Sequence, residues 1–360
     1  MKITEADVVG RRIPLADDFP VSYEEHVDTE HLFVRLHTDE GAVGYGEGTS
    51  LPWFTGETLP GMVAAAEEWL LPTVVGEQLE DAVADFDERA RQFPHNPGAK
   101  AAVELALLDL RGKRAGVPVR DLLGPTVRSE IPLVYPIPGV APDRALELAD
   151  EGIEAGFDRF KIKATGNVDN DIDRIDAVTG RLPDGATARV DPNTSWENTP
   201  KATRILERLA NPDQLEYVEQ PVSPDRPTDL RALWYDTGIP VFADEFVNGP
   251  ADVTDLGEDG LAAGCHLKLA KTGSLSRMSA MAETANDYAM AATPVSAFGT
   301  SLEATAICHL AATVRKIPLA CELDPGLIAA DPTTAPLEIR PTISIPEGPG
   351  LGIDLAEDLF

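Results

Sequence analysis

The chain has 360 residues, 43% of them hydrophobic, and 61 acidic against 30 basic side chains give a formal net charge of −31 at pH 7. The hydrophobic content supports a sizeable packed core and excludes general disorder, and the length suits two domains or one barrel with an attached domain. So strong an acidic surplus makes nucleic acid and anionic membranes poor partners.

The first hundred residues are predicted to form an α+β unit. Residues 31–38 alternate apolar and polar side chains, and a second strand at 42–48 follows an Asp-Glu-Gly turn, which predicts a hairpin. Helical patterns follow at 57–75, 80–93 and 99–116. We assign residues 1–125 to this domain.

From residue 131 onward, short apolar runs alternate with amphipathic helical stretches. Eight such runs occur, at 131–137, 159–164, 186–191, 215–220, 240–245, 264–270, 290–296 and 319–324. Alternating strands and helices predict parallel βαβ units, and eight of them predict a closed (β/α)8 TIM-type barrel in the α/β class. An open doubly wound sheet is the alternative, but no GxGxxG or GxxxxGK[ST] motif follows a predicted strand. The barrel is assigned to 126–330, and 331–360 is predicted to return to the N-terminal domain.

Three acids lie at the ends of successive predicted barrel strands. Asp191, Glu219 and Asp244 are spaced by 28 and 25 residues (191 to 219, 219 to 244), about one βα repeat each, so they should meet at the C-terminal mouth of the barrel. Each alone could cap a helix or be a solvated charge, but three unpaired carboxylates together would repel one another and resist burial. An oxygen-only set suits Mg²⁺, and a set without His or Cys argues against zinc.

Lysines accompany these acids. Lys161 and Lys163, in the run RFKIKATG (159–166), are two residues apart and should point together into the barrel. Lys268 follows Asp244 by one further repeat, which places it on the opposite wall. Burial, neighbouring cations and a metal would lower the pKa of such a lysine, so that two opposed lysines could remove and return the α-proton of a carboxylate. Structural ion pairs with the acids are the alternative.

Together these motifs resemble the enolase superfamily, in its muconate-lactonizing-enzyme subgroup. The motifs that carry the resemblance are GAVGYGEG (41–48), KIK (161–163), VDPN (190–193), VEQP (218–221), ADE (243–245), LKLAKTG (267–273), GTSLEAT (299–305) and PEGPGLGID (346–354). The resemblance implies that the α+β domain caps the barrel and that the protein is a homo-oligomer. The resemblance implies that Asp191, Glu219 and Asp244 bind Mg²⁺. It implies that Lys163 and Lys268 are the acid–base pair and that Lys161 supports the substrate carboxylate. Asn193 is then expected to contact a metal ligand.

The eighth predicted strand bears on the reaction. Glu322 and Asp324 keep the spacing of an Asp-x-Asp pair that holds the substrate ammonium in dipeptide-epimerising members, but the first acid is Glu. Cycloisomerases of the subgroup tend to show Glu-Leu, then an apolar residue and Gly-Pro, and this sequence shares only their Glu-Leu. Two acids would favour a zwitterionic or cationic substrate over a dianionic muconate, unless Glu322 faces a positive neighbour.

The first prediction is therefore a Mg²⁺-dependent isomerase that epimerises a dipeptide or N-acyl amino acid, a small-molecule carboxylate, through an enolate. Muconate-type cycloisomerisation is the alternative, and a non-catalytic metal-binding barrel is the second alternative. A sugar-acid dehydratase is disfavoured because no late strand offers a His base, since His309 lies in a helical stretch and should be packed.

Two loops of the first domain, 21–30 and 49–58, should close over the substrate, with Trp53 and Phe54 as lid aromatics or as interface packing. Glu24 and Glu25 suggest a cationic or neutral substrate side chain, but surface adaptation is the preferred explanation in so acidic a chain.

The remaining composition indicates the setting of the protein. No apolar run of about eighteen residues and no N-terminal signal pattern occurs, which predicts a soluble cytoplasmic protein with no membrane partner. Cys265, Cys308 and Cys321 are widely spaced without a CxxC and are predicted to be buried free thiols. The scattered acids predict a halophilic protein, because concentrated salt screens self-repulsion.

Overall fold

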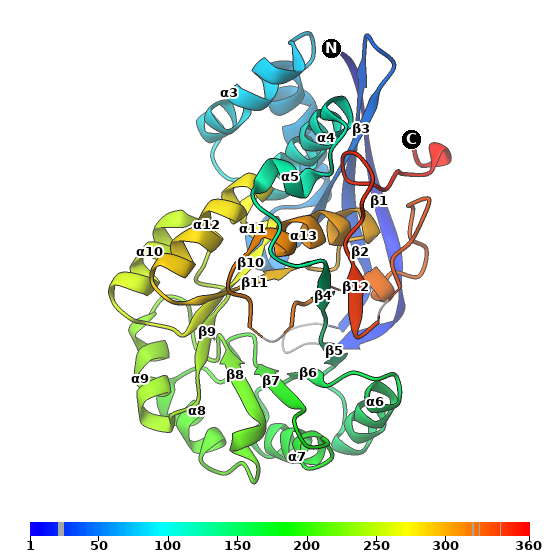
Figure 1. Cartoon of the computed structure of the whole chain (residues 1–360). Coiled ribbons are helices and arrows are strands. Elements are labelled where there is room, and N and C mark those ends of the chain that lie inside the picture. Colours follow the sequence, from blue (N-terminus) through cyan, green and yellow to red (C-terminus); the bar gives the residue numbers. More distant parts are fainter. Residues whose placement is uncertain (21–24, 319, 324, 339) are drawn as a thin grey trace.

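A computed structural model describes residues 1–20, 25–318, 320–323, 325–338 and 340–360. Its N-terminal part combines an antiparallel sheet with helices, and this part lies against a curved parallel sheet that is surrounded by helices (Figure 1). The α/β class and the barrel type predicted from the sequence are confirmed.

The N-terminal sheet has three antiparallel strands in the order β1-β2-β3. They are β1 (Ile3–Pro20), β2 (Glu25–Thr38) and β3 (Val43–Ser50). The predicted hairpin is thus confirmed as β2 and β3. β1 was not predicted from the sequence, because its glycine, prolines and many charged side chains have low strand propensity. Pairing with β2 along most of its length nevertheless stabilises it as a strand.

The GYGEG motif presents a row of glycines to α4 (Pro97–Ala115). A Cβ at Gly46 would lie 1.8 Å from the carbonyl oxygen of Ala102, and one at Gly48 would lie 2.0 Å from that of Gly98. Only a residue without a side chain allows the helix backbone to approach the strand so closely. These glycines therefore set the position of α4 on the sheet.

Two of the three helices predicted in this domain form as expected, and the third is interrupted. The prediction at 80–93 corresponds to α3 (Leu79–Gln92), and α4 ends at Gly116, whose φ is 69°. The prediction at 57–75 was wrong as one helix, since α2 (Leu59–Ala65) passes into a π-helical turn, η1 (Ala66–Leu70), and a 3-10 turn, η2 (Leu71–Thr73). Pro72 lacks the N–H that a continuing α-helix needs. The short helices α1 (Pro52–Thr55) and α5 (Val119–Leu123) complete the domain.

The barrel sheet has seven strands in the order β11-β10-β9-β8-β7-β6-β5, and each described pairing between neighbours is parallel. The strands are β5 (Tyr135–Ile137), β6 (Arg159–Lys163), β7 (Thr187–Asp191), β8 (Leu215–Glu219), β9 (Val241–Ala243), β10 (Gly264–Lys268) and β11 (Ala291–Val295). Six predicted runs, from 159–164 to 290–296, therefore coincide with β6 to β11.

The first and last predicted barrel strands need correction. The run 131–137 is divided between β4 (Glu130–Pro132), which pairs antiparallel with β12 (Thr342–Ser344), and β5. Within 320–323, the described part of the last run, Cys321 and Glu322 form only single parallel bridges, to Leu133 and Val295. These two bridges connect the two edges of the sheet, so the ring closes with very little strand pairing.

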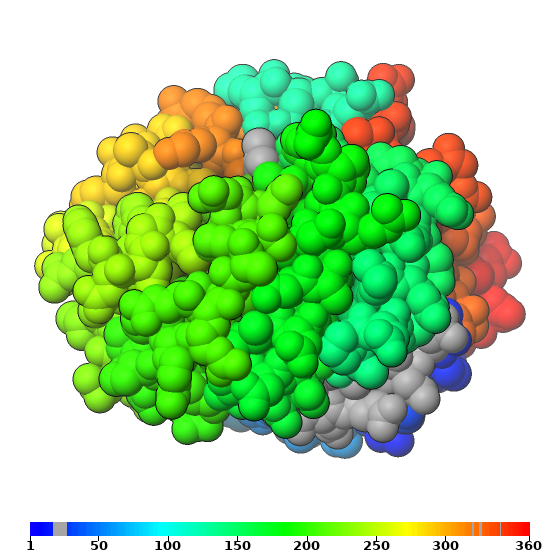
Figure 2. Space-filling model, turned by 90° about the horizontal axis from the view of Figure 1, so that it is seen from below, coloured from blue at the N-terminus to red at the C-terminus, as the bar shows by residue number. Residues whose placement is uncertain are grey.

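Helices surround this sheet, and Figure 2 shows the face of the molecule that the green part of the chain covers. The helices are α6 (Pro142–Glu154), α7 (Val168–Thr179), α8 (Thr199–Leu206), α9 (Thr228–Thr237), α10 (Pro250–Glu258), α11 (Leu269–Thr272), α12 (Leu275–Asp287) and α13 (Ser301–Thr313). Short 3-10 turns are η3 (Pro212–Gln214), η4 (Pro325–Leu327) and η5 (Glu357–Leu359). No helix in the described ranges is long and apolar enough to cross a membrane.

The C-terminal segment contacts both parts of the molecule. The Leu351 N–H donates to Asp109 of α4 over 2.8 Å, and the guanidinium of Arg35 in β2 lies 4.3 Å from the ring centroid of Phe360. His309, as predicted, is packed, being fully buried with Nε2 3.0 Å from the Leu351 carbonyl oxygen. The three cysteines are free and buried, as predicted. The division of the chain at 125 and 330 stays a prediction.

Candidate active site

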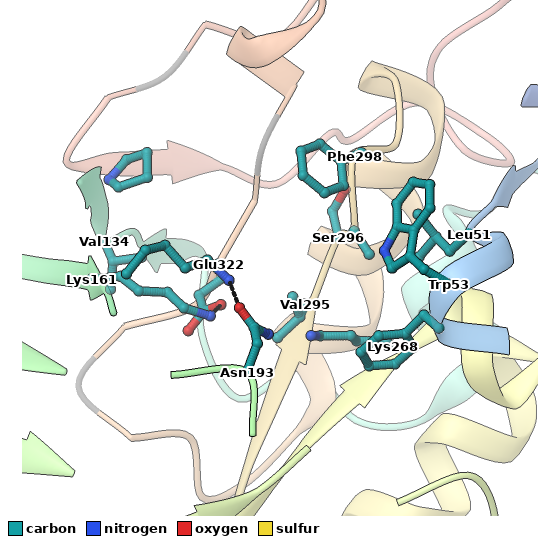
Figure 3. A pocket seen from close by; sticks show the side chains of 14 residues that line it. Leu51, Trp53, Val134, Lys161, Asn193, Lys268, Val295, Ser296, Phe298 and Glu322 are labelled. Atoms are coloured by element: carbon teal, nitrogen blue, oxygen red, sulfur yellow. Dashed lines mark hydrogen bonds and ion pairs between the residues drawn. The ribbon is translucent and has the colours of Figure 1, made fainter. Parts of the chain in front are cut away.

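A cavity of about 710 Å³, part of which is open to solvent, lies at the C-terminal ends of the barrel strands. Side chains from both parts of the molecule line it, with Leu51, Trp53 and Phe54 from the N-terminal part. From the barrel it receives Lys161, Lys163, Asn193, Lys268 and Glu322, all of them predicted site residues. In the close view, Lys161 and Glu322 lie on one side, Lys268 on the other, and Asn193 between them (Figure 3).

The two lysines of β6 share a carboxylate. Lys161 Nζ lies 2.9 Å from Asp191 Oδ2, 2.7 Å from Glu219 Oε2 and 2.6 Å from Glu322 Oε2. Lys163 Nζ donates to the same Asp191 oxygen over 2.6 Å and to Asn193 Oδ1 over 2.9 Å. Both side chains therefore point into the barrel, as their spacing predicted.

Lys268, at the end of β10, donates to Asp244 Oδ2. The other Asp244 oxygen accepts from Lys271 over 2.7 Å, and the Asp244 carbonyl accepts from the same ammonium over 2.5 Å. Both ammonium groups lie over the ring of Phe54, at 5.1 and 5.6 Å from its centroid. Lys271 belongs to the LKLAKTG motif, but no role was predicted for it from the sequence.

Asn193 contacts Asp191, as the resemblance implied. Its backbone N–H donates to Asp191 Oδ1 over 2.8 Å, and its side-chain amide donates to Glu245 Oε1 over 3.3 Å. Its φ of 43° lies in the left-handed region, which asparagine tolerates better than most residues. This turn holds the Asn193 oxygen in position to accept from Lys163.

A buried polar network that the sequence analysis missed lies on the neighbouring strands. Arg189 contacts Glu322 Oε1 at 3.3 Å and Glu216 at 2.9 Å. His266 places Nδ1 3.3 Å from Glu219 Oε1, and its Nε2 lies 2.9 Å from the Tyr217 hydroxyl. Arg189, Tyr217 and His266 each stand two residues before a predicted site residue and so share its side of the strand. That period of two is the signal that could have identified them.

Burial and charge act in opposite directions on the carboxylates. Burial alone would raise the pKa of Asp191, but Lys161 and Lys163 more than compensate and hold it below its ordinary value. Asp244 behaves in the same way, with Lys268 and Lys271 lowering its pKa against the effect of burial. Burial, reinforced by the negative charge of Asp191, instead raises the pKa of Glu219. Glu219 is therefore the member of the predicted triad whose charge the surrounding protein stabilises least.

The acids around Lys268 oppose the lowered lysine pKa that the sequence predicted for a metal-bound site. Burial lowers its pKa, but Asp244 and Glu219 face the ammonium and raise the pKa above its ordinary value. Burial likewise lowers the pKa of Lys161, and Asp191 and Glu219 outweigh this effect. The acids in contact with each ammonium, which a sequence does not count, decide the direction.

Comparisons with known proteins agree with this arrangement. Residues 144–359 match the family model described as "Enolase C-terminal domain-like", and residues 3–124 match the mandelate racemase/muconate lactonizing enzyme N-terminal domain. The chain belongs to the enolase superfamily, in its muconate-lactonizing-enzyme subgroup. It is an isomerase of that superfamily.

Relatives within the subgroup differ in their reactions. The structure of N-succinyl Arg/Lys racemase from Bacillus cereus has a TM-score of 0.94 and 28% identity, covering 100% of this chain and 97% of that one. A dipeptide epimerase from Enterococcus faecalis, complexed with Mg and L-Leu-L-Tyr, has a TM-score of 0.92 and 27% identity, covering 98% and 99%. A chloromuconate cycloisomerase from Pseudomonas putida is 30% identical, covering 99% of this chain and 98% of that protein.

The residues of this enolase-superfamily member fit a hard divalent cation. Asp191, Glu219 and Asp244 are fully buried and offer oxygen alone, and neither Glu219 carboxylate oxygen accepts a well-directed hydrogen bond, although Lys161 is within ion-pair distance. Of the described residues, a different group, Glu219, His266 and Glu322, is the one that places one ligand atom of each within 4.8 Å of the others. We favour the all-oxygen set, because a nitrogen ligand suits Mg²⁺ poorly.

The aromatic residues predicted for the lid lie at the cavity of this superfamily member. Phe54 packs beside Leu51, Ala270 and Ala297. The relative solvent-accessible surface of Trp53 is 39%. Both the lid role and interface packing agree with this placement. Asp324 and Glu24 lie outside the described residues, and the side chain of Glu25 is likewise not described.

Proposed function

We propose that the chain is a Mg²⁺-dependent epimerase or racemase that moves the α-proton of a dipeptide or N-acyl amino acid through an enolate intermediate. The observation that supports this most is that Lys163 and Lys268 line one cavity from β6 and β10. Three strands separate β6 from β10 in the sheet, so the two lysines approach from different walls. Two ammonium groups placed in this way can serve the two faces of one planar carbon.

The neighbours of each lysine suit proton transfer at a fixed point. Asp191 and Asn193 orient the Lys163 ammonium, and Asp244 orients that of Lys268. Leu51, Phe54 and Ala297 supply apolar walls beside them, which exclude water from the proton being moved. Lys163 and Lys268 exchange roles as base and acid between the two directions of the reaction.

The charged residues below the cavity would hold the substrate carboxylate. Asp191, Glu219 and Asp244 would bind the metal, with Asn193 orienting Asp191 and Lys161 adding positive charge. Bound there, Mg²⁺ would stabilise the negative charge that develops on the substrate carboxylate during proton removal. Glu322, paired with Lys161, would keep that ammonium pointing toward the site.

Cycloisomerisation of a muconate is the second candidate, and one observation favours it. Glu322 contacts both Lys161 and Arg189, so its negative charge is neutralised locally. A dianionic substrate is therefore less strongly disfavoured than the two acids of the sequence indicated. A non-catalytic barrel is the least supported candidate, because a structural metal site has no use for two lysines facing the same cavity.

The experiment is solvent deuterium incorporation. The protein is incubated with Mg²⁺ and KCl in D₂O with a panel of L,L-dipeptides and N-acyl amino acids, and mass spectrometry measures the mass gain at the α-carbon. Deuterium uptake by the wild type that one of the two variants Lys163→Met and Lys268→Met abolishes supports the proposal, with Lys201→Met as the charge-matched control outside the cavity. Lactone formation from muconates without uptake across the panel would instead establish cycloisomerisation.

A further inference from the structure

A second cavity, of about 780 Å³ and open in part to solvent, shares the lining residue Phe54 with the site described above. Lys100, Lys271, Arg277 and His95 line it together with Thr272 and Asn248. Phe54 borders both cavities, and none of the described residues that line the second one is acidic. In a chain with a net charge of −31, such a lining is unusual.

The lysine distribution makes the same point. The chain has only nine lysines, and five of them line these two cavities. Three belong to the site already described, and Lys100 and Lys271 belong to the second cavity. Random placement in so acidic a protein would not concentrate lysine in this way. The positive charge of the second cavity therefore favours a negatively charged ligand.

The cations of the second cavity differ in what they already contact. Lys271 contacts Asp244 at 2.7 Å, and Arg277 contacts Asp87 at 2.8 Å. The side chain of Lys100 makes no hydrogen bond and no ion pair within the described ranges, although Glu57 and Asp87 act on it at longer range. The Glu57 carboxylate is turned away to the start of α4, where it accepts from the N–H groups of Gly98 and Ala99.

We propose that this cavity binds a small free oxyanion of the sulfate or phosphate type, held by Lys100 and Arg277, with the buried Lys271 adding positive charge behind them. A ligand with several acceptor oxygens matches two cationic donors and the neighbouring polar groups of Thr272 and Asn248. Lys100 belongs to α4 of the N-terminal domain, whereas Lys271 and Arg277 belong to α11 and α12 of the barrel. The bound anion therefore ties the two parts together next to Phe54, the residue that covers Lys268.

The test uses sulfate as the probe and Lys100→Met as the variant. Because Lys100 has no ion-pair partner to lose, this substitution leaves the fold intact, which circular dichroism verifies. Isothermal titration of the Mg²⁺-containing protein with sulfate, at constant ionic strength, should give saturable binding that the variant weakens by about tenfold or more. Lys201→Met, which removes the same charge outside the cavity, should bind sulfate as the wild type does.

Three results would overturn the proposal. The first is a wild type without saturable sulfate binding, and the second is a Lys100→Met variant that binds sulfate as tightly as the wild type. The third is a substrate effect without sulfate binding, in which Lys100→Met raises the KM only for substrates with a second, distal carboxylate. The cavity would then belong to the substrate site. Sulfate binding is measured without substrate. A negative result therefore counts against the oxyanion site and not against the proposed epimerase activity.

Discussion

Lys161 and Glu322 form an ion pair inside the barrel, with Nζ 2.6 Å from Oε2. Arg189 approaches the other Glu322 oxygen at 3.3 Å, so two cations contact one buried acid. Burial raises the pKa of Glu322, but Lys161, followed by His266 and Arg189, outweighs it and lowers the pKa to about 2. The acid on the last barrel segment thus holds the lysine and arginine beneath the cavity and offers little free charge to a substrate.

Removal of Arg189 should destabilise the barrel. Its guanidinium is fully buried between Glu322 and Glu216, and loss of one partner from a buried pair costs about 3–5 kcal/mol. Arg208→Met is the matched control, since Arg208 is 49% exposed and its surface pair with Asp169 is worth at most about 1 kcal/mol. Urea unfolding measures the free energy of unfolding of both variants. An equal decrease of this free energy in the two would contradict the importance of the buried network.

His309 should make the protein sensitive to mild acid. Burial lowers its pKa from 6.5 to about 4, so between these values the unfolded chain binds a proton that the folded one does not. The free energy of unfolding should therefore fall as the pH drops from about 6.5 to about 4, by up to about 3 kcal/mol, with no further loss from this group below that range. His309→Gln keeps a donor toward the Leu351 carbonyl but does not titrate. Its unfolding free energy should vary less over that range, and an unchanged slope would count against this role of His309.

Gly46→Ala should disturb the contact between β3 and α4. The added methyl group would lie 1.8 Å from the Ala102 carbonyl oxygen, and such overpacking costs about 1–3 kcal/mol or more. At Gly249, in extended backbone at the start of α10, nothing lies within 4 Å of a new Cβ. Thermal unfolding of the two alanine variants should separate them, and a Gly46→Ala protein as stable as Gly249→Ala would show that α4 can shift without cost.

Salt should stabilise the protein. The net charge of −31 implies repulsion between surface acids, and KCl at about 1 M shortens the screening length to about 3 Å. We propose on this basis that the protein is adapted to a salt-rich medium. Its unfolding temperature should rise by several degrees between low and molar KCl. A constant or falling unfolding temperature would remove the basis for a halophilic origin.

Much of this site could be predicted from the sequence because a barrel repeats. Each βα unit places the end of its strand at the same mouth, so the spacing from Asp191 to Glu219 to Asp244 was enough to bring these acids together. The same rule placed Lys161, Lys163 and Lys268 at that mouth, and the structure finds all three lining one cavity.

Other features depend on geometry that spacing does not encode. Closure of the ring rests on the single bridges Leu133–Cys321 and Val295–Glu322, and such short contacts carry no strand pattern. The raised pKa of Lys268 depends on how many acids face its ammonium, and the neutralisation of Glu322 depends on Arg189 reaching across from β7. These are relations between strands that lie far apart in the sequence.

The central claim is that two lysines act on opposite faces of one carbon, and exchange measured separately on each epimer tests it most directly. Lys163→Met and Lys268→Met are each incubated in D₂O with Mg²⁺ and with either pure epimer of a substrate. If each lysine serves one face, each variant should lose epimerisation, by a factor of about 100 to 10,000, and yet exchange the α-proton of one epimer, a different epimer for each variant. The contrary result is that one variant exchanges the α-proton of neither epimer while the other variant epimerises the substrate normally. A single lysine would then carry out the reaction, which contradicts the two-lysine account.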